Sequence, residues 1–212
     1  MFADRTEAGE ALARRLRRKP MADPVVYALP RGGVPVALPV ARVLNAPLDL
    51  LLVRKLGAPG QPELAAGALV EGAEPVFNHP ILSAFGVTEA DMAPQVARKR
   101  DEIAQRRDLW LNGREPVPVR DRTAIVVDDG IATGATIRAA LKGLRGRRPG
   151  RIVLAVPVAP ADTVATLRPL VDDLICLETP EPFLAVGAHY RHFDQVPDAA
   201  VAAMLSDYSR GG

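Results

Sequence analysis

The 212-residue sequence is long enough to bury a substantial hydrophobic core and fits a single domain, residues 1–212. Apolar residues make up 48% and the formal net charge is +2, which excludes a typical disordered chain and gives no reason by itself to expect a nucleic-acid partner. The single cysteine, Cys176, excludes an internal disulfide framework, and no apolar stretch has the length of a signal peptide or a membrane span. We therefore expect a cytoplasmic protein that has no membrane partner.

The first predicted element is an amphipathic helix from about Thr6 to Lys19, which Pro20 ends. Its last turns, ARRLRRKP, form a basic cluster. We interpret this cluster as a solvated face that complements the helix dipole, because no aromatic residues are interleaved with the charges as in a nucleic-acid contact.

Short apolar runs and helical segments then alternate along the chain. The predicted strands are VVYAL, LDLLLV, TAIVV, RIVLAVPV and DLICLE. The predicted helices run from the PRGGVP turn to about Leu44, from Thr88 as N-cap to about Leu111, from the turn after TAIVV to about Leu144, from about Ala161 to Leu170, and over a short C-terminal segment. Between them, residues 56–85 are rich in Gly, Pro and Ala, which predicts a long mobile loop with a short hairpin.

This alternation predicts an α/β fold, in which helices cover both faces of one parallel sheet. The strands are almost entirely apolar, as expected when both faces of a sheet are buried. Ligands of such sheets bind outside the carboxyl ends of the strands. Three predicted strands end there in LPRGG, VRK and VDDGIATGAT, so we expect these segments to converge.

The turn ATGAT has the composition of a phosphate-binding site. Gly134 permits a tight turn, and Thr133 and Thr136 offer hydroxyl groups. Main-chain N–H groups at the start of the following helix carry partial positive charge, which favours a phosphate monoester. Neither the Gly-Lys-Ser/Thr of a nucleoside-triphosphate loop nor the dinucleotide pattern Gly-x-Gly-x-x-Gly is present.

Two adjacent carboxylates, Asp128 and Asp129, lie directly before this turn. They would repel a phosphate unless they bind hydroxyl groups or a cation while the turn binds the phosphate. A sugar phosphate meets both requirements, because its hydroxyl groups can bind the acids while its phosphate binds the turn. The alternative is a strand that ends in solvated acids.

The segment VVDDGIATGAT resembles the signature of type I phosphoribosyltransferases, enzymes that use phosphoribosyl pyrophosphate (PRPP). The resemblance covers most of the chain in motif order, and its pattern is nearest to the adenine and orotate enzymes. It implies the fold of that family, with a small hood and flexible loop at residues 56–85. It also implies that the acids contact the ribose hydroxyls and that the turn binds the 5′-phosphate, which gives as PRPP-binding residues Asp128, Asp129, Gly130, Ile131, Ala132, Thr133, Gly134, Ala135 and Thr136.

Two further motifs match the family's pyrophosphate-binding segments. LPRGG corresponds to its pyrophosphate loop, where Arg31 supplies charge and Gly32 and Gly33 let backbone amides approach the ligand. Family members often hold a cis peptide in this loop, here between Pro30 and Arg31. Arg54 and Lys55 match the basic pair after the next strand.

The segment RKLGAPGQPELAAGALVEGAE resembles the flexible loop and hood of adenine phosphoribosyltransferases. By position, Glu71 corresponds to the hood glutamate and would take a proton from the incoming nucleophile, with Glu63 as the alternative. Both glutamates could equally be exposed hood residues. Closure of such a loop would exclude water from the reacting centre.

Two departures from the family's pattern bear on the acceptor. The enzymes for 6-oxopurines carry a third acid where this chain has Ala132, and a lysine after the next strand where this chain reads AVPVAPADT. We therefore expect an acceptor other than a 6-oxopurine. PEPFLAVGAHYRHF resembles the family's base-stacking segment, with Phe183 either as the stacking residue or as a core residue.

The reaction implied is displacement of pyrophosphate from PRPP by a nitrogen nucleophile, with Mg²⁺ held by Asp128 and Asp129 mainly through the ribose hydroxyls and water. Two alternatives stay open: a PRPP sensor with little catalysis, and a phosphate-binding subunit of a larger assembly. The resemblance also leaves a homodimer open. A sensor would be expected to carry a nucleic-acid-binding element, for which the first helix offers only its basic end. The acceptor could be a purine, a pyrimidine or another amine.

Overall fold

The structure is a computed structural model in which residues 1–210 are described. Its centre is a five-stranded sheet in the order β2-β1-β6-β7-β8, and every neighbouring pair is parallel. The strands are β1 (Pro24–Ala28), β2 (Leu48–Leu50), β6 (Thr123–Val127), β7 (Arg151–Val158) and β8 (Asp173–Glu178). The predicted parallel sheet is therefore confirmed.

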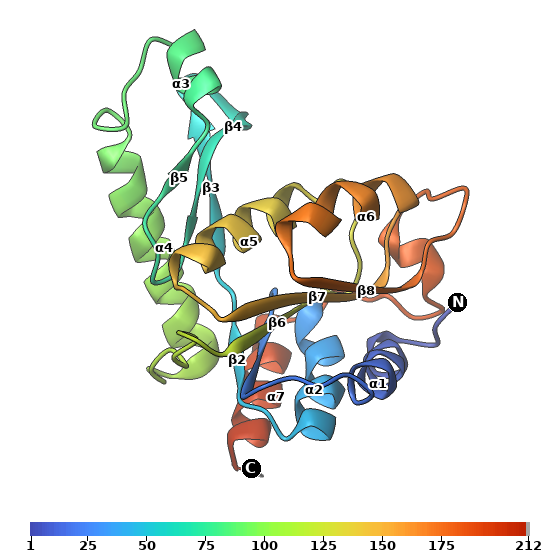
Figure 1. Cartoon of the computed structure of the whole chain (residues 1–212). Coiled ribbons are helices and arrows are strands. Elements are labelled where there is room, and N and C mark those ends of the chain that lie inside the picture. Colours follow the sequence, from blue (N-terminus) through green and yellow to red (C-terminus); the bar gives the residue numbers. More distant parts are fainter. Residues whose placement is uncertain (211–212) are drawn as a thin grey trace.

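Helices cover both faces of this sheet (Figure 1). One face carries α1 (Arg5–Leu16), α2 (Gly33–Leu44) and α7 (Asp198–Arg210), and the other carries α5 (Ala135–Gly146) and α6 (Ala161–Leu167). Successive strand residues point to opposite faces. Accordingly, Val26 packs in the cluster beneath α1 and α2, whereas Val25 and Tyr27 pack in the cluster beneath α5. This two-sided burial explains why the strands are apolar throughout.

A second, antiparallel sheet forms a hood beside the central sheet (Figure 1). It consists of β3 (Val53–Ala58), β4 (Gln61–Val70) and β5 (Val76–Phe77), followed by the short helix α3 (His79–Ala84). The hairpin and hood expected for this region are present, but strands and the short helix α3, and not a long loop, occupy most of residues 56–85. The Gly and Ala content instead serves close packing, since a Cβ on Gly67 would lie 2.7 Å from the carbonyl oxygen of Val76.

The hood joins the core through two helices. Helix α4 (Ala93–Leu111) runs alongside the hood strands, and its residue Ile103 packs in the same cluster as Leu69 of β4. On the other side, β4 and α5 approach so closely that a Cβ on Gly143 would lie 2.2 Å from the Val70 side chain. The base of the hood is therefore fixed to the sheet domain.

Several predicted boundaries are shifted. Helix α4 begins at Ala93 and not at Thr88, because Thr88 closes a separate turn in which its N–H and hydroxyl groups donate to Asp91 at 2.8 and 2.7 Å. The run LDLLLV is divided, since β2 ends at Leu50 and Val53 already belongs to β3. The segment after β8 contains the 3₁₀ helix η2 (Val186–His189), and another, η1 (Arg168–Leu170), follows α6.

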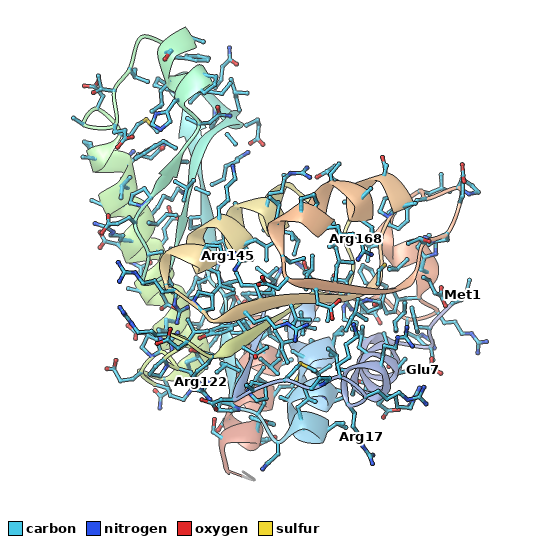
Figure 2. All side chains as sticks on the ribbon, in the orientation of Figure 1. Met1, Glu7, Arg17, Arg122, Arg145 and Arg168 are labelled. Atoms are coloured by element: carbon cyan, nitrogen blue, oxygen red, sulfur yellow. The ribbon has the colours of Figure 1, made fainter. Side chains whose placement is uncertain are left out.

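The basic end of α1 is a solvated face, as predicted. Arg14, Arg15, Arg17 and Arg18 are exposed, and Figure 2 shows Arg17 at the outer edge of the helical layer. Lys19 is paired with Asp173 at 2.5 Å. Among the described residues, no helix combines the length and apolarity that crossing a bilayer requires.

Candidate functional site

Two of the predicted motifs meet at the carboxyl edge of the central sheet. The loop after β1 is tied to β6 by a hydrogen bond from the Leu29 N–H to the Val127 carbonyl oxygen, 2.9 Å. A Cβ on Gly32 would lie 2.0 Å from Oδ2 of Asp129, and one on Gly33 would lie 2.7 Å from the carbonyl oxygen of Val127. The PRGG loop and the acid pair are thus in contact, and glycine is required for that contact. The peptide bond between Pro30 and Arg31 is cis, as expected.

The acid pair forms a compact, half-buried unit. Oδ1 of Asp128 accepts a hydrogen bond from the N–H of Asp129 at 2.9 Å. Burial, followed by the neighbouring Asp129 charge, raises the pKa of Asp128 well above its usual range. Burial also raises the pKa of Asp129, although its hydrogen bond with Arg5 opposes this shift. Hydroxyl donors or a cation placed here would relieve the repulsion between the two carboxylates.

Arg5 at the start of α1 binds the acid pair, and no motif in the sequence marks it. Its Nε donates to Oδ2 of Asp129 at 2.8 Å, and its Nη1 donates to the carbonyl oxygen of Asp194 at 2.8 Å. The guanidinium lies 3.8 Å from the centre of the Phe193 ring. The Tyr190 hydroxyl donates to the carbonyl oxygen of Asp129 at 2.5 Å. The N- and C-terminal segments therefore hold Asp129 from one side.

The predicted phosphate turn lies between β6 and α5. Gly134 is the N-cap of α5 and adopts a left-handed conformation, φ 72° and ψ 8°, that favours glycine. The carbonyl oxygen of Ala132 accepts from the Thr163 hydroxyl at 2.9 Å, and that of Thr133 accepts from Nη2 of Arg138 at 2.6 Å. Within residues 1–210, the N–H groups of Thr133 and Gly134 make no hydrogen bond. The turn is therefore fixed through its carbonyl groups and keeps these amides free for a ligand.

Arg138 is a second basic residue that motif reasoning did not identify. It lies in the first turn of α5, and its Nη1 also donates to the Thr166 hydroxyl at 3.2 Å. Its position four residues after Gly134 is the sequence signal that could have found it, because residues at this spacing lie on one face of a helix.

Each of the three predicted pyrophosphate-binding cations has a carboxylate partner. Arg31 lies 3.6 Å from Asp198, and Nε of Arg54 donates to Glu102 at 3.3 Å. Nζ of Lys55 donates to the fully exposed Glu63 at 3.0 Å. Glu63 therefore serves as the partner of Lys55.

Glu71 lies at the base of the hood. Nη1 of Arg107 donates to Glu71 at 2.8 Å, and Nη2 of Arg107 donates to the buried Asp49 at 3.2 Å. Burial raises the pKa of Glu71, and the Arg107 charge opposes this shift. Glu71 also lines a cavity of about 650 Å³ beside α4. Its contacts tie it to α4 and β2, so the structure does not bring it together with Asp128 and Asp129.

Phe183 lies near the carboxyl ends of β7 and β8. Its ring stacks on that of His189, with centroids 5.0 Å apart, and it is half-buried. It lines a cavity of about 360 Å³ together with Pro160, Ala161, Asp162, Thr179, Pro180 and Glu181. A planar acceptor could therefore reach one edge of this ring.

The carboxylates at the sheet edge determine whether the site could hold Mg²⁺. No group of three or more His, Cys, Asp or Glu side chains within residues 1–210 is placed to hold a metal ion. Mg²⁺ commonly binds through one or two carboxylates, with substrate oxygens and waters completing its shell. Asp128 and Asp129 fit that kind of site, in which most ligands come from the substrate.

Comparison with known proteins agrees with this geometry. A sequence model described as "Phosphoribosyl transferase domain" matches residues 4–189. Two curated Mycobacterium tuberculosis proteins are each 44% identical over 216 residues, "Putative phosphoribosyl transferase MT0597" of strain CDC 1551 / Oshkosh and "Putative phosphoribosyl transferase Rv0571c" of strain ATCC 25618 / H37Rv. The match covers 100% of this chain and 49% of each relative, so the chain spans about half the length of these relatives.

A solved structure is similar over nearly its whole length. The crystal structure of TT1426 from Thermus thermophilus is 41% identical, with a TM-score of 0.86 and coverage of 98% of both chains. Because the family's sequence model matches most of the chain, the protein described here belongs to the phosphoribosyltransferase family.

Proposed function

We propose that this protein transfers the 5-phosphoribosyl group of PRPP to a nitrogen nucleophile and releases pyrophosphate. The observation that carries the proposal is the contact between the PRGG loop and the acid pair. A Cβ on Gly32 would overlap Asp129, so the two segments are in direct contact at the sheet edge. The free amides of the turn before α5 adjoin the same strand end.

In this reaction the bond from C1 to the pyrophosphate oxygen breaks and a bond from C1 to nitrogen forms. The N–H groups of Thr133 and Gly134 would bind the 5′-phosphate. Asp128 and Asp129 would bind the ribose hydroxyls and favour positive charge at C1, while Arg31, Arg54 and Lys55 would stabilise the departing pyrophosphate. Mg²⁺, bound mainly by PRPP itself and held by the acid pair, would neutralise part of the phosphate charge.

The acceptor in this proposal is a nucleobase other than a 6-oxopurine, with Phe183 as its stacking partner. The nitrogen loses a proton during transfer, and Glu71 is the proposed base. Its raised pKa suits proton transfer, but its ion pair with Arg107 would have to open and the side chain would have to move to the acid pair first. The proposal places the reaction in nucleotide metabolism in the cytoplasm, and it leaves a homodimer to be tested.

The test is pyrophosphate release from PRPP and Mg²⁺ with a panel of nucleobases and other amines. We expect release with at least one acceptor, and none from the doubly substituted Asp128→Asn, Asp129→Asn variant. PRPP binding without release under any condition would favour a sensor. Unchanged PRPP affinity in the double variant would refute the role of the acids.

Glu71→Gln provides a separate test of the base. We expect it to slow transfer and leave PRPP affinity unchanged. Unaltered turnover would show that Glu71 takes no part in the chemistry, and Glu63→Gln would then test the other glutamate.

A further inference from the structure

Helix α4 is linked to two of the three residues to which the proposed function assigns pyrophosphate binding, directly to Arg54 and through Asp198 to Arg31. Arg31 and Arg54 come from different elements, the loop after β1 and strand β3. Each is paired with a carboxylate, and each carboxylate is shared with a basic residue of α4. A motif search misses this arrangement, because α4 itself reads as an ordinary charged helix.

The first shared carboxylate is Asp198, the first residue of α7. Its Oδ1 lies 3.6 Å from Nη1 of Arg31 and accepts a hydrogen bond from Nε1 of Trp110 at 3.2 Å. Its Oδ2 accepts from Nη1 of Arg106 at 3.3 Å. The guanidinium of Arg106 also lies over the Trp110 ring, 5.3 Å from its centre. The Asp198 carboxylate therefore contacts the side chains of Arg31, Arg106 and Trp110.

The second shared carboxylate is Glu102 in α4. It accepts from Nε of Arg54 at 3.3 Å and from Nζ of Lys99 at 2.7 Å. The hydrogen bond from Lys99 lowers the pKa of Glu102. Lys99, Glu102 and Arg106 follow the spacing i, i+3, i+7, which places them on one face of the helix. On that face Glu102 pairs with Arg54, and Arg106 shares the Asp198 carboxylate with Arg31.

We propose, on the basis of the function proposed above, that Lys99 and Arg106 are pyrophosphate-binding residues. Asp198 and Glu102 occupy the positions of phosphate oxygens while the site is empty; Asp198 pairs with Arg31 and Arg106, and Glu102 pairs with Arg54 and Lys99. An incoming pyrophosphate displaces these carboxylates from Arg31, Arg54, Lys99 and Arg106.

The charges of the cluster support this exchange. Four cations share two carboxylates, which leaves a net charge of +2 in favour of an added anion. Guanidinium groups bind phosphate oxygens in the same geometry in which they bind carboxylates. The side chains of Arg106 and Asp198 are 42% and 37% exposed, so a ligand can reach the contact.

The test is a calorimetric titration of the intact chain, in the presence of Mg²⁺, with inorganic pyrophosphate and separately with PRPP. Ribose 5-phosphate, which has no pyrophosphate, is the control ligand. We expect Arg106→Gln and Lys99→Gln each to weaken binding of pyrophosphate and PRPP about tenfold, the usual effect of losing one charged hydrogen bond, and to leave ribose 5-phosphate unaffected. Arg106→Lys should restore part of the affinity.

Two further variants separate ligand binding from structural support. Arg100→Gln is the matched control, because Arg100 lies on the same helix but pairs with Glu74 of the hood at 3.5 Å, and its binding should match the unsubstituted chain. Asp198→Asn should tighten pyrophosphate binding about threefold, because an internal competitor is removed. A purely structural Asp198 would instead lower the melting temperature without tightening binding.

Trp110, the only tryptophan of the chain, gives a direct optical signal. Its emission should change with pyrophosphate and not with ribose 5-phosphate, because only pyrophosphate displaces Asp198 from the indole N–H. Affinities within about twofold of the unsubstituted chain for both Arg106→Gln and Lys99→Gln would overturn the inference while leaving the proposed function standing. An unsubstituted chain that binds neither PRPP nor pyrophosphate would overturn both.

Discussion

Gly32→Ala tests how the PRGG loop and the acid pair are fitted together. Gly32 has ordinary helical backbone angles, φ −61° and ψ −33°, so alanine introduces no backbone strain. The added Cβ would instead lie 2.0 Å from Oδ2 and 2.6 Å from Cγ of Asp129. The short Asp129 side chain can turn away, but it then loses the hydrogen bond from Arg5.

The expected magnitudes differ between stability and binding. Loss of the Arg5 contact, partly offset by solvation of Asp129, should lower the free energy of unfolding by about 1 kcal/mol. Displacement of one of the two acids proposed to bind the ribose hydroxyls should weaken PRPP binding about 100-fold, or about 2.7 kcal/mol. Gly33→Ala should have the larger effect on the fold, because its Cβ meets the backbone of Val127 at 2.7 Å, which cannot rotate away. Overpacking of this kind costs about 3 kcal/mol.

Urea unfolding and calorimetric titration with PRPP and Mg²⁺ measure the two effects separately. Gly146→Ala is the matched control, since its Cβ would make an ordinary 3.8 Å contact with Ala73 at the end of α5. It should leave PRPP affinity unchanged and keep or slightly raise stability. A Gly32→Ala protein that binds PRPP as tightly as the unsubstituted chain would refute the geometry described for the site.

Two other predictions concern buried acids. The pKa of Asp128 is raised in the folded state, so the unfolded chain releases this proton first as pH rises above about 4, and the group then disfavours folding. Asp128→Asn should therefore gain melting temperature relative to the unsubstituted chain as pH rises from about 4 toward about 8, and a constant difference across that range would contradict this explanation. Arg107→Ala removes the nearer of the two arginines paired with the buried Asp49 and should cost about 3–5 kcal/mol in urea unfolding. Arg145→Ala, which breaks the exposed pair with Asp172, should cost under about 1 kcal/mol of unfolding free energy. Equal losses of stability for the two variants would refute the conclusion that burial makes the Arg107 pair the more important one.

The sequence was sufficient to predict an element where the interactions that determine that element are local. The run TAIVV followed by the turn at Gly134 predicts both β6 and α5, because burial on both faces and a helix-capping glycine are visible within about twenty residues. The contact between the PRGG loop and the acid pair could also be predicted from the sequence, because the carboxyl ends of parallel strands lie at the same edge of the sheet. These elements make up the central part of the candidate site.

The remaining features depend on contacts between distant segments. Arg5 and Asp129 are separated by 124 positions, and no periodicity links them. The extent of the hood strands does not follow from the sequence, because small residues permit both loops and closely packed strands, such as those in which Gly67 approaches Val76. Glu71 was assigned by position in the chain, whereas its side-chain partner, Arg107, comes from α4. Tertiary packing decides each of these cases.

The most direct test of the account is a crystal structure of the protein with PRPP and Mg²⁺. It should place the ribose hydroxyls within hydrogen-bonding distance of Asp128 and Asp129, and the 5′-phosphate on the main-chain N–H groups of Thr133 and Gly134. A ligand bound elsewhere, with the acid pair still held by Arg5 and these amides unoccupied, would contradict it.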